Sequence, residues 1–193
     1  MNSSEIKHAQ TQHAVSEFIR KRWSARAFND TQIPQETLET LLEAASWAPS
    51  ANNEQPWVYY YAFKGTEGFE KLWNCLLPGN QLWTKNASVL VLSLARKTFE
   101  ANQKPNNSAK YDVGAANATL LLEATQHDIF GHIMGGFDAE KTKNMFNLDE
   151  NLEPVVMMAL GYLAEAETLE EPFKTRELTP RKRKSVSEIS KKL

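Results

Sequence analysis

The chain is poor in the residues that secreted, membrane-spanning and strongly charged proteins use. Its single cysteine, Cys75, excludes an intrachain disulfide framework and is typical of a reducing compartment, so a cytoplasmic location is expected. The longest apolar runs, near 57–63, 89–95 and 155–163, are too short to cross a bilayer as helices. Residues 1–12 are polar and contain no apolar signal-peptide core. A net charge of −2 argues against nucleic-acid binding through overall charge.

The sequence also lacks the common catalytic motifs. None of the 4 histidines has metal-ligand spacing with another histidine or with Cys75, which argues against a metal site. No nucleophile elbow, Walker A loop or dinucleotide-binding glycine fingerprint follows a predicted strand. No obvious side-chain nucleophile or acid–base pair is present. Any catalysis is therefore expected to rest on a bound cofactor.

The apolar pattern predicts helices interleaved with strands. Helices are predicted over 14–19, 34–45, 69–76, 111–126 and 139–146, the last with Asp138 as a candidate N-cap, and apolar residues recur at helical spacing over 34–45 and 69–76. Runs of apolar and β-branched residues predict strands over 57–63, 88–94 and 155–160. Residues 78–80 are expected to end a helix, 97–108 to form a mobile loop and 131–138 a glycine-rich bend. This order predicts a central sheet with helices on both sides.

We expect one domain over residues 1–193, with 163–193 as an extended C-terminal tail. The chain of 193 residues is long enough for a single well-packed core, and no domain boundary interrupts it. The helix over 111–126 is apolar nearly all round, which predicts burial in this core or against another subunit. The tail is too polar to fold alone, so it is expected to wrap over this domain or over a partner.

A dense set of short polar side chains lies between the helix over 34–45 and the strand over 57–63. Pro49 stops the helix, and Ser50, Asn53 and Gln55 follow it. Such groups form directional hydrogen bonds without bringing charge, which suits the recognition of a polar ring system. A helix end followed by an asparagine-rich turn is the ordinary alternative.

Two basic clusters lie far apart in the sequence. Arg22 and Arg26 flank Ser24, while Arg181 and Arg183 belong to the C-terminal tail. Guanidinium groups bind phosphate oxygens in a planar, bidentate geometry. Taken separately, each cluster is more simply a solvated basic segment. If the two clusters converge, they could neutralise a phosphate dianion together.

These motifs, taken in order, resemble the FMN-dependent nitroreductase family. The resemblance rests on Arg-x-Ser-x-Arg-x-Phe from Arg22, Pro-Ser-x-x-Asn-x-Gln-Pro-Trp from Pro49, Met-Gly-Gly-Phe-Asp from Met134, and the basic tail. It implies an α+β fold of three layers, α/β/α, in which helices flank a central mixed sheet. It also implies a homodimer with FMN sites at the interface and a tail that wraps onto the partner subunit.

The resemblance also implies a role for each motif residue. Arg22, Ser24, Arg181 and Arg183 would bind the phosphate and ribityl end of FMN, and Arg26 would lie near the N1–O2 edge of its ring. The loop with Pro49, Ser50, Asn53 and Gln55 would reach the FMN of the other subunit. Met134, Gly135 and Gly136 would line the flavin through backbone groups. Asn80 would either contact the pyrimidine edge or act as a turn residue.

The activity implied is hydride transfer from NAD(P)H through flavin N5 to a nitroaromatic, a quinone or a similar small acceptor, in a ping-pong cycle. Arg26 would stabilise the negative charge that reduction places near N1. Larger relatives insert helices where this chain has only the loop over 97–108. A flavin-binding storage or sensing protein without turnover is the alternative, and a cofactor-free interaction protein is a third reading.

Overall fold

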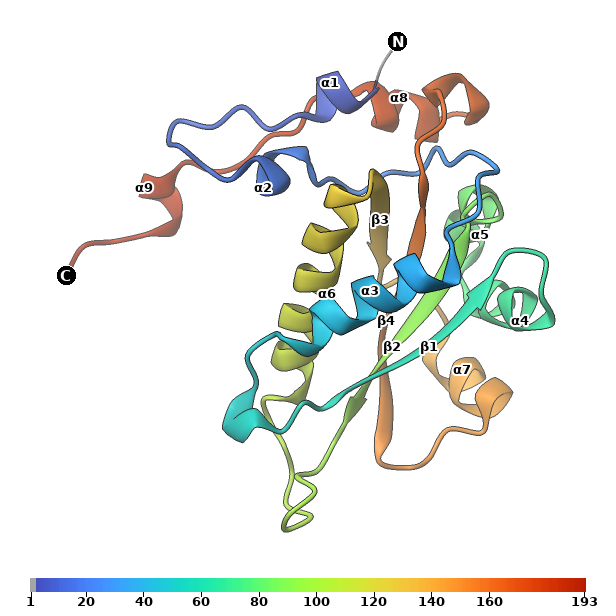
Figure 1. Ribbon diagram of the computed structural model, residues 1–193, viewed down its shortest axis with the longest axis vertical. Coiled ribbons are helices and arrows are strands. Elements are labelled where there is room, and N and C mark those ends of the chain that lie inside the picture. Colours follow the sequence, from blue (N-terminus) through green and yellow to red (C-terminus); the bar gives the residue numbers. More distant parts are fainter. Residues whose placement is uncertain (1–2) are drawn as a thin grey trace.

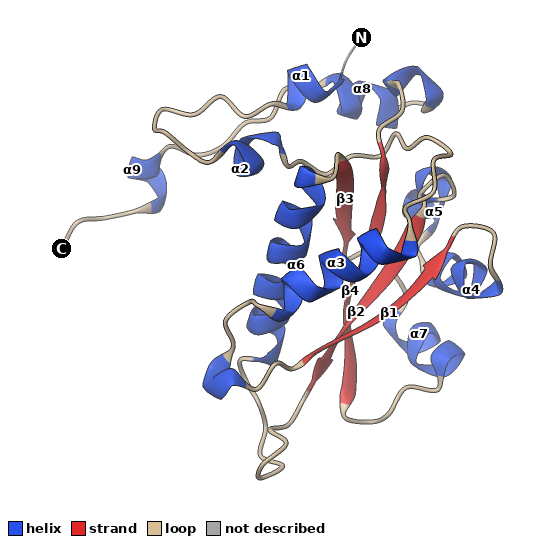
Figure 2. Ribbon diagram, viewed as in Figure 1, coloured by secondary structure: helices blue, strands red, loops and turns tan. Residues whose placement is uncertain are grey.

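The structure is a computed structural model that describes residues 3–193 (Figure 1). The first two residues of the polar stretch 1–12 lie outside the described residues. Four strands, shown in red in Figure 2, form one sheet in the order β1-β2-β4-β3. Their bounds are β1 Trp57–Phe63, β2 Val89–Arg96, β3 Ile129–Met134 and β4 Leu152–Tyr162.

Helices and short 3₁₀ turns make up most of the rest. The helices before β2 are α1 Ser3–Lys7, α2 Glu17–Lys21, α3 Gln35–Ser46, α4 Glu67–Cys75 and α5 Pro78–Thr84. Those after it are α6 Ala109–Gln126, α7 Ala139–Phe146, α8 Phe173–Leu178 and α9 Val186–Ile189. The two 3₁₀ turns are η1 Ala51–Asn53 and η2 Ala166–Thr168.

The α+β class is confirmed, but the pairing of the strands differs from the mixed sheet expected. Among the described residues, every strand pairing is antiparallel. The interleaved helices in the sequence do not determine strand direction, because a connection that contains a helix can join either parallel or antiparallel strands. Strand β4 also begins before the predicted range 155–160, so that Pro154 lies inside it. The register shifts opposite Ser93 and Leu94, and this bulge accommodates a residue without a backbone N–H.

The strands separate two apolar cores. Along β2, Leu90, Leu92 and Leu94 face a core that contains residues of α4 and α5, while Val89 and Val91 face a core shared with α3 and α6. This alternation follows from the two-residue period of a strand. It explains why β2 is a continuous apolar run and confirms that helices cover both faces of the sheet. Figure 2 shows α3 and α6 crossing one face.

Two local predictions are wrong. Pro78 begins α5 instead of ending a helix, because a proline is well suited to a helix's first position. Residues 129–134 form β3 where part of a bend was expected. A Cβ on Gly131 would lie 2.1 Å from Leu121 Cδ2, so this glycine permits close packing of the strand on α6 rather than a turn. Asp138 caps α7 as predicted, accepting from the Lys141 N–H at 2.8 Å.

The two terminal segments run side by side at one end of the molecule (Figure 1). Lys7 Nζ in α1 donates to the carbonyls of Arg176 and Thr179, both at 2.6 Å, and so joins the start of the chain to α8. In this single chain the tail therefore packs on its own N-terminal segment. The division into one domain with a tail from 163, and contact of that tail with a partner, stay predictions.

Within residues 3–193, no helix combines the length and apolar character that a membrane span requires.

Candidate functional site

A cavity of about 550 Å³ lies between the N-terminal segment and the tail. Three of the predicted phosphate ligands line it: Arg22, Arg181 and Arg183. The structure thus brings Arg22 of the first basic cluster together with Arg181 and Arg183 of the second, about 160 residues away in sequence. Its other lining residues are Ala9, Gln10, Thr11, Gln12, His13, Val15, Ile19, Lys184, Ser185, Val186 and Glu188. Ser24, which is exposed, is not among them.

The three arginines do not have the same surroundings. Arg181 donates through Nη1 to the carbonyl of Arg22 at 2.6 Å and through Nη2 to that of Arg20 at 2.5 Å. Its terminal nitrogens thus bind the carbonyls at the end of α2, where the helix dipole favours a cation. Burial lowers the pKa of the Arg22 guanidinium, and the nearby charge of Arg183 lowers it further. An anion between these two side chains would relieve that repulsion.

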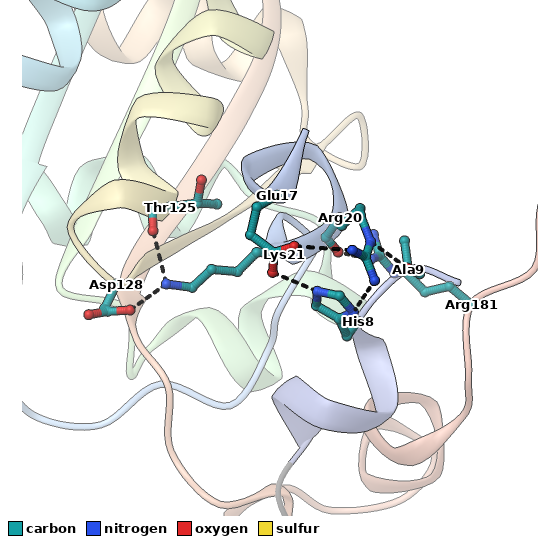
Figure 3. A network of polar contacts seen from close by, with 8 residues as sticks. All are labelled: His8, Ala9, Glu17, Arg20, Lys21, Thr125, Asp128 and Arg181. Atoms are coloured by element: carbon teal, nitrogen blue, oxygen red, sulfur yellow. Dashed lines mark hydrogen bonds and ion pairs between the residues drawn. The ribbon is translucent and has the colours of Figure 1, made fainter. Parts of the chain in front are cut away.

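A network of polar contacts fixes α2 and thereby the start of this site (Figure 3). Lys21 Nζ donates to the carbonyl of Thr125 at 3.1 Å and to Asp128 at 2.5 Å, which joins α2 to the C-terminal end of α6. Arg20 and His8 both contact Glu17, at 3.3 and 2.7 Å. The hydrogen bond with His8 is the main cause that lowers the pKa of the Glu17 carboxyl. The arginine cavity therefore rests on an anchored helix.

Arg26 belongs to a second group of side chains. Its guanidinium lies 5.8 Å from the ring centroid of Trp83, within cation–π range. The ring of His132 packs on Trp83 with centroids 4.6 Å apart, and its Nδ1 lies 3.0 Å from the Ala25 carbonyl. Burial, followed by the charge of Arg26, lowers the pKa of His132 to about 4. His132 is therefore neutral at pH 7, and the Ala25 carbonyl requires its proton on Nδ1.

The glycine-rich motif leaves the sheet beside this group. Met134, at the end of β3, is buried, while Gly135 is exposed and a Cβ there would meet nothing within 4 Å. The Gly136 carbonyl accepts from Asn80 Nδ2 at 2.9 Å and from the Leu77 N–H at 3.0 Å. A Cβ on Gly136 would lie 2.7 Å from that amide nitrogen. Asn80, in α5, thus holds this motif in place and is not a turn residue.

The loop after α3 has an unusual backbone. Asn52, Asn53 and Gln55 all have positive φ, at 56°, 57° and 51°, a conformation that asparagine tolerates better than most residues. Ser50 Oγ accepts from the Gln55 N–H at 3.0 Å and closes the loop. Pro49, Asn53 and Gln55 are exposed. Two polar side chains, Asn53 and Gln55, are therefore exposed on an ordered loop, and Gln55 Nε2 donates to the Asn53 carbonyl at 3.2 Å.

This loop and the arginine cavity lie at opposite ends of α6. The Ala51 N–H donates to Asp112 at 3.1 Å in the first turn of that helix, whereas Lys21 binds the carbonyl of Thr125 at its other end. Thirteen residues of helix at 1.5 Å each separate these anchors by roughly 20 Å. Within one chain, the loop and Arg22 therefore do not form one compact site.

Sequence reasoning missed three side chains near Arg26: Trp83, His132 and Glu177. Glu177 has no exposed surface and accepts from the N–H groups of Arg26 and Ala27 at 3.0 and 3.1 Å. In an acidic stretch of the tail, nothing in the sequence distinguishes it from its solvated neighbours. The spacing of His132 from the other histidines bears only on metal binding and gives no sign of its contact with Trp83. Among residues 3–193, no three His, Cys, Asp or Glu side chains are grouped to hold a metal ion.

Fold and site together define an α+β protein with a basic cavity and a second arginine held against an aromatic ring. Residues 19–77 and 69–162 match the model of the nitroreductase family, so the chain belongs to that family.

Similar solved structures and similar sequences agree with membership of the nitroreductase family. A structure titled "The crystal structure of the oxidoreductase containing FMN" is 33% identical and superposes with a TM-score of 0.90, covering 98% of this chain and 96% of that one. The "Putative NADH dehydrogenase/NAD(P)H nitroreductase" of Archaeoglobus fulgidus is 28% identical over 148 residues, which are 75% of this chain and 82% of the relative. A nitroreductase family protein of Streptococcus pneumoniae, 21% identical with a TM-score of 0.74, covers 92% of this chain and shares the fold.

Proposed function

We propose that this protein is an FMN-dependent oxidoreductase that passes a hydride from NAD(P)H to a nitroaromatic, a quinone or a similar small acceptor. Bound FMN would supply the two-electron chemistry of a ping-pong cycle. Membership of the nitroreductase family supports this assignment. So do a similar structure whose title names FMN and a relative whose name includes NAD(P)H nitroreductase.

The observation that carries the proposal is the convergence of Arg22 and Arg183 on one cavity. Two guanidinium groups suit the phosphate of FMN, and Arg181 supports Arg22 by binding its carbonyl. Gly135, with open space where a side chain would be, suits the close approach of a flat ring. The residues present therefore fit FMN. In this assignment Ser24 adds a neutral donor, and Met134 and Gly136 contribute backbone groups.

Arg26 would act on the electronics of the bound ring. It is half-buried, lies over Trp83, and has its pKa lowered chiefly by burial, so its charge is poorly solvated. A cation of this kind stabilises negative charge at its neighbour more strongly than a fully hydrated one. Its task is to hold that positive charge near the N1–O2 edge of the ring.

We further propose that the active form is a homodimer in which the loop of one subunit completes the site of the other. The separation of roughly 20 Å along α6 supports this, because the loop with Pro49, Ser50 and Asn53 lies too far from Arg22 of its own chain. Trp47, directly after α3, and Tyr111, in α6, are each 82% exposed and are large apolar side chains that a partner could cover. The cytoplasmic location also stays a prediction.

The visible spectrum of the purified protein tests the function. We expect a yellow protein, or a colourless one that becomes yellow with added FMN, whose absorbance bleaches with NADPH or NADH under anaerobic conditions. A nitroaromatic or quinone should restore the colour. A flavin that binds but does not respond to either nicotinamide would indicate a storage or sensing protein. A chain that takes up no FMN would contradict the proposal.

A further inference from the structure

The backbone that carries Ser24 and Arg26 is held from two sides by side chains of distant segments, the partly buried His132 and the buried Glu177. His132, on β3, lies 3.0 Å from the Ala25 carbonyl. On the other side, Glu177 Oε1 accepts from the N–H groups of Arg26 and Ala27. These donors belong to an irregular segment without a sheet partner for them, so the glutamate provides what a neighbouring strand would otherwise provide.

The glutamate is costly to bury. Glu177 has no exposed surface, and its second oxygen, Oε2, has no hydrogen-bond partner within the described part of the chain. A buried, incompletely paired carboxylate destabilises a fold relative to an apolar side chain of similar volume. Burial accordingly raises the pKa of the Glu177 carboxyl, although the two N–H groups and the charges of Arg26 and Lys7 oppose this. An apolar residue would have been enough to pack α8.

The helix that carries Glu177 is itself pinned by a second buried charge. Lys7 is only 8% exposed, and its Nζ donates to the carbonyls of Arg176 and Thr179, one on each side of Glu177 in the chain. The same ammonium lies 5.3 Å from the ring centroid of Trp23. The carboxylate therefore approaches the backbone of Arg26 from a fixed position.

We propose that Glu177 is a positioning residue for Arg26: it fixes the backbone at 26–27 from the C-terminal tail, with Lys7 holding the helix that carries it. A carboxylate is a stronger hydrogen-bond acceptor than a neutral oxygen, and its two bonds to adjacent N–H groups, at 3.0 and 3.1 Å, fix the backbone from which the Arg26 side chain extends. The role rests on the proposed flavin site, because that site gives the orientation of Arg26 its importance.

Two substitutions distinguish the effect of the hydrogen-bond acceptor on Glu177 from the effect of its negative charge. Glu177→Gln removes the charge but keeps an oxygen that can accept from both N–H groups. Glu177→Met removes both while keeping the length of the side chain. Glu170→Gln, an exposed glutamate just before α8, is the matched control. Glu177→Ala is a second variant without an acceptor, in case the methionine does not pack.

Amide hydrogen exchange in the FMN-free protein is the first measurement. We expect the amides of Arg26 and Ala27 to exchange at least ~10-fold faster in Glu177→Met, and within about 3-fold of wild type in Glu177→Gln and the control. Protected amides of β2 show that each variant is folded. A folded methionine or alanine variant with wild-type protection at 26 and 27 overturns the proposal. If neither folds, loss of that protection in the glutamine variant overturns it.

The second measurement is the flavin potential, which a purely structural role would not move. Glu177→Met and Glu177→Gln both lack the charge, so a difference between them reports the orientation of Arg26. We expect a lower midpoint potential in the methionine variant, by about 30 mV for each tenfold loss in preference for reduced FMN. Equal potentials would refute the positioning role. If wild type binds no FMN, the proposed function fails, while hydrogen exchange still tests the contact.

Discussion

Replacing His132 with asparagine should flatten the dependence of stability on pH. In the folded protein this ring is packed on Trp83 and within hydrogen-bond distance of the Ala25 carbonyl. Burial, with a smaller effect of Arg26, lowers its pKa to about 4. In the unfolded chain the same ring titrates near its ordinary value of about 6.5. Asparagine retains an N–H donor close to the position of Nδ1 but cannot take up a proton.

The sign follows from which state binds the proton. Between about pH 6.5 and pH 4, the unfolded chain protonates this histidine and the folded protein does not, so folding becomes less favourable as the pH falls. The stabilisation is present above pH 6.5 and is lost progressively toward pH 4. With those two pKa values, His132 alone removes about 2 kcal/mol of unfolding free energy between pH 7 and pH 5. Below pH 4 both states bind the proton and this loss stops.

Urea unfolding of the FMN-free protein at pH 7, 6 and 5 measures the effect. Wild type should lose about 2 kcal/mol more than His132→Asn over this range, and groups that titrate in both proteins cancel in the difference. His13→Asn, which changes an exposed histidine, controls for the loss of a histidine elsewhere. Equal slopes for wild type and His132→Asn would refute the reasoning, because a neutral imidazole packed between Trp83 and the Ala25 carbonyl must resist protonation.

Four further predictions concern the flavin, the interface and the core. Arg26→Ala should lower the flavin midpoint potential by tens of millivolts; an unchanged potential with FMN still bound would contradict its electrostatic role. Asn53→Ala should weaken FMN retention, measured by dialysis, without changing the circular dichroism spectrum; full retention would favour an ordinary turn. Trp47→Asp should shift the protein toward monomer in sedimentation velocity, because the exposed indole is a candidate interface anchor. Leu120→Ala, at a position with no exposure, should reduce the unfolding free energy by roughly 2–5 kcal/mol in urea titration.

The best-predicted elements are those whose pattern reports burial directly. The helical spacing that predicted 34–45 matches α3 at Gln35–Ser46, where Leu38, Leu41 and Ala45 are buried. The apolar run over 88–94 corresponds to β2, buried along almost its whole length. Strand β3 could not be predicted in the same way. Gly131 fits there only because Leu121 of α6 occupies the space of a side chain, and that packing is not visible in local sequence.

The functional site likewise depends on tertiary contacts that the local sequence does not show. The motifs identified Arg22 and Arg26 but did not predict that Arg22 would line a cavity with Arg183 while Arg26 would lie against Trp83. Arg181 was expected to bind phosphate, whereas its Nη1 and Nη2 bind backbone carbonyls. His132 gave no signal beyond its residue type, because its low pKa arises from burial beside Arg26 in the folded protein. Residue chemistry can be read from sequence, but the choice of partner depends on tertiary contacts.

The tail shows how far composition alone can lead. Its polar composition predicted that it wraps over this domain or a partner but not through which contacts, and Glu177 and Arg181 reach back to backbone groups of residues 20–27. Backbone groups in irregular segments need partners, and charged side chains satisfy them without an apolar core of their own. A segment can therefore be polar in sequence and still be firmly attached. Because residues 20–27 include Arg22, Ser24 and Arg26, this attachment connects the order of the tail to the geometry of the site.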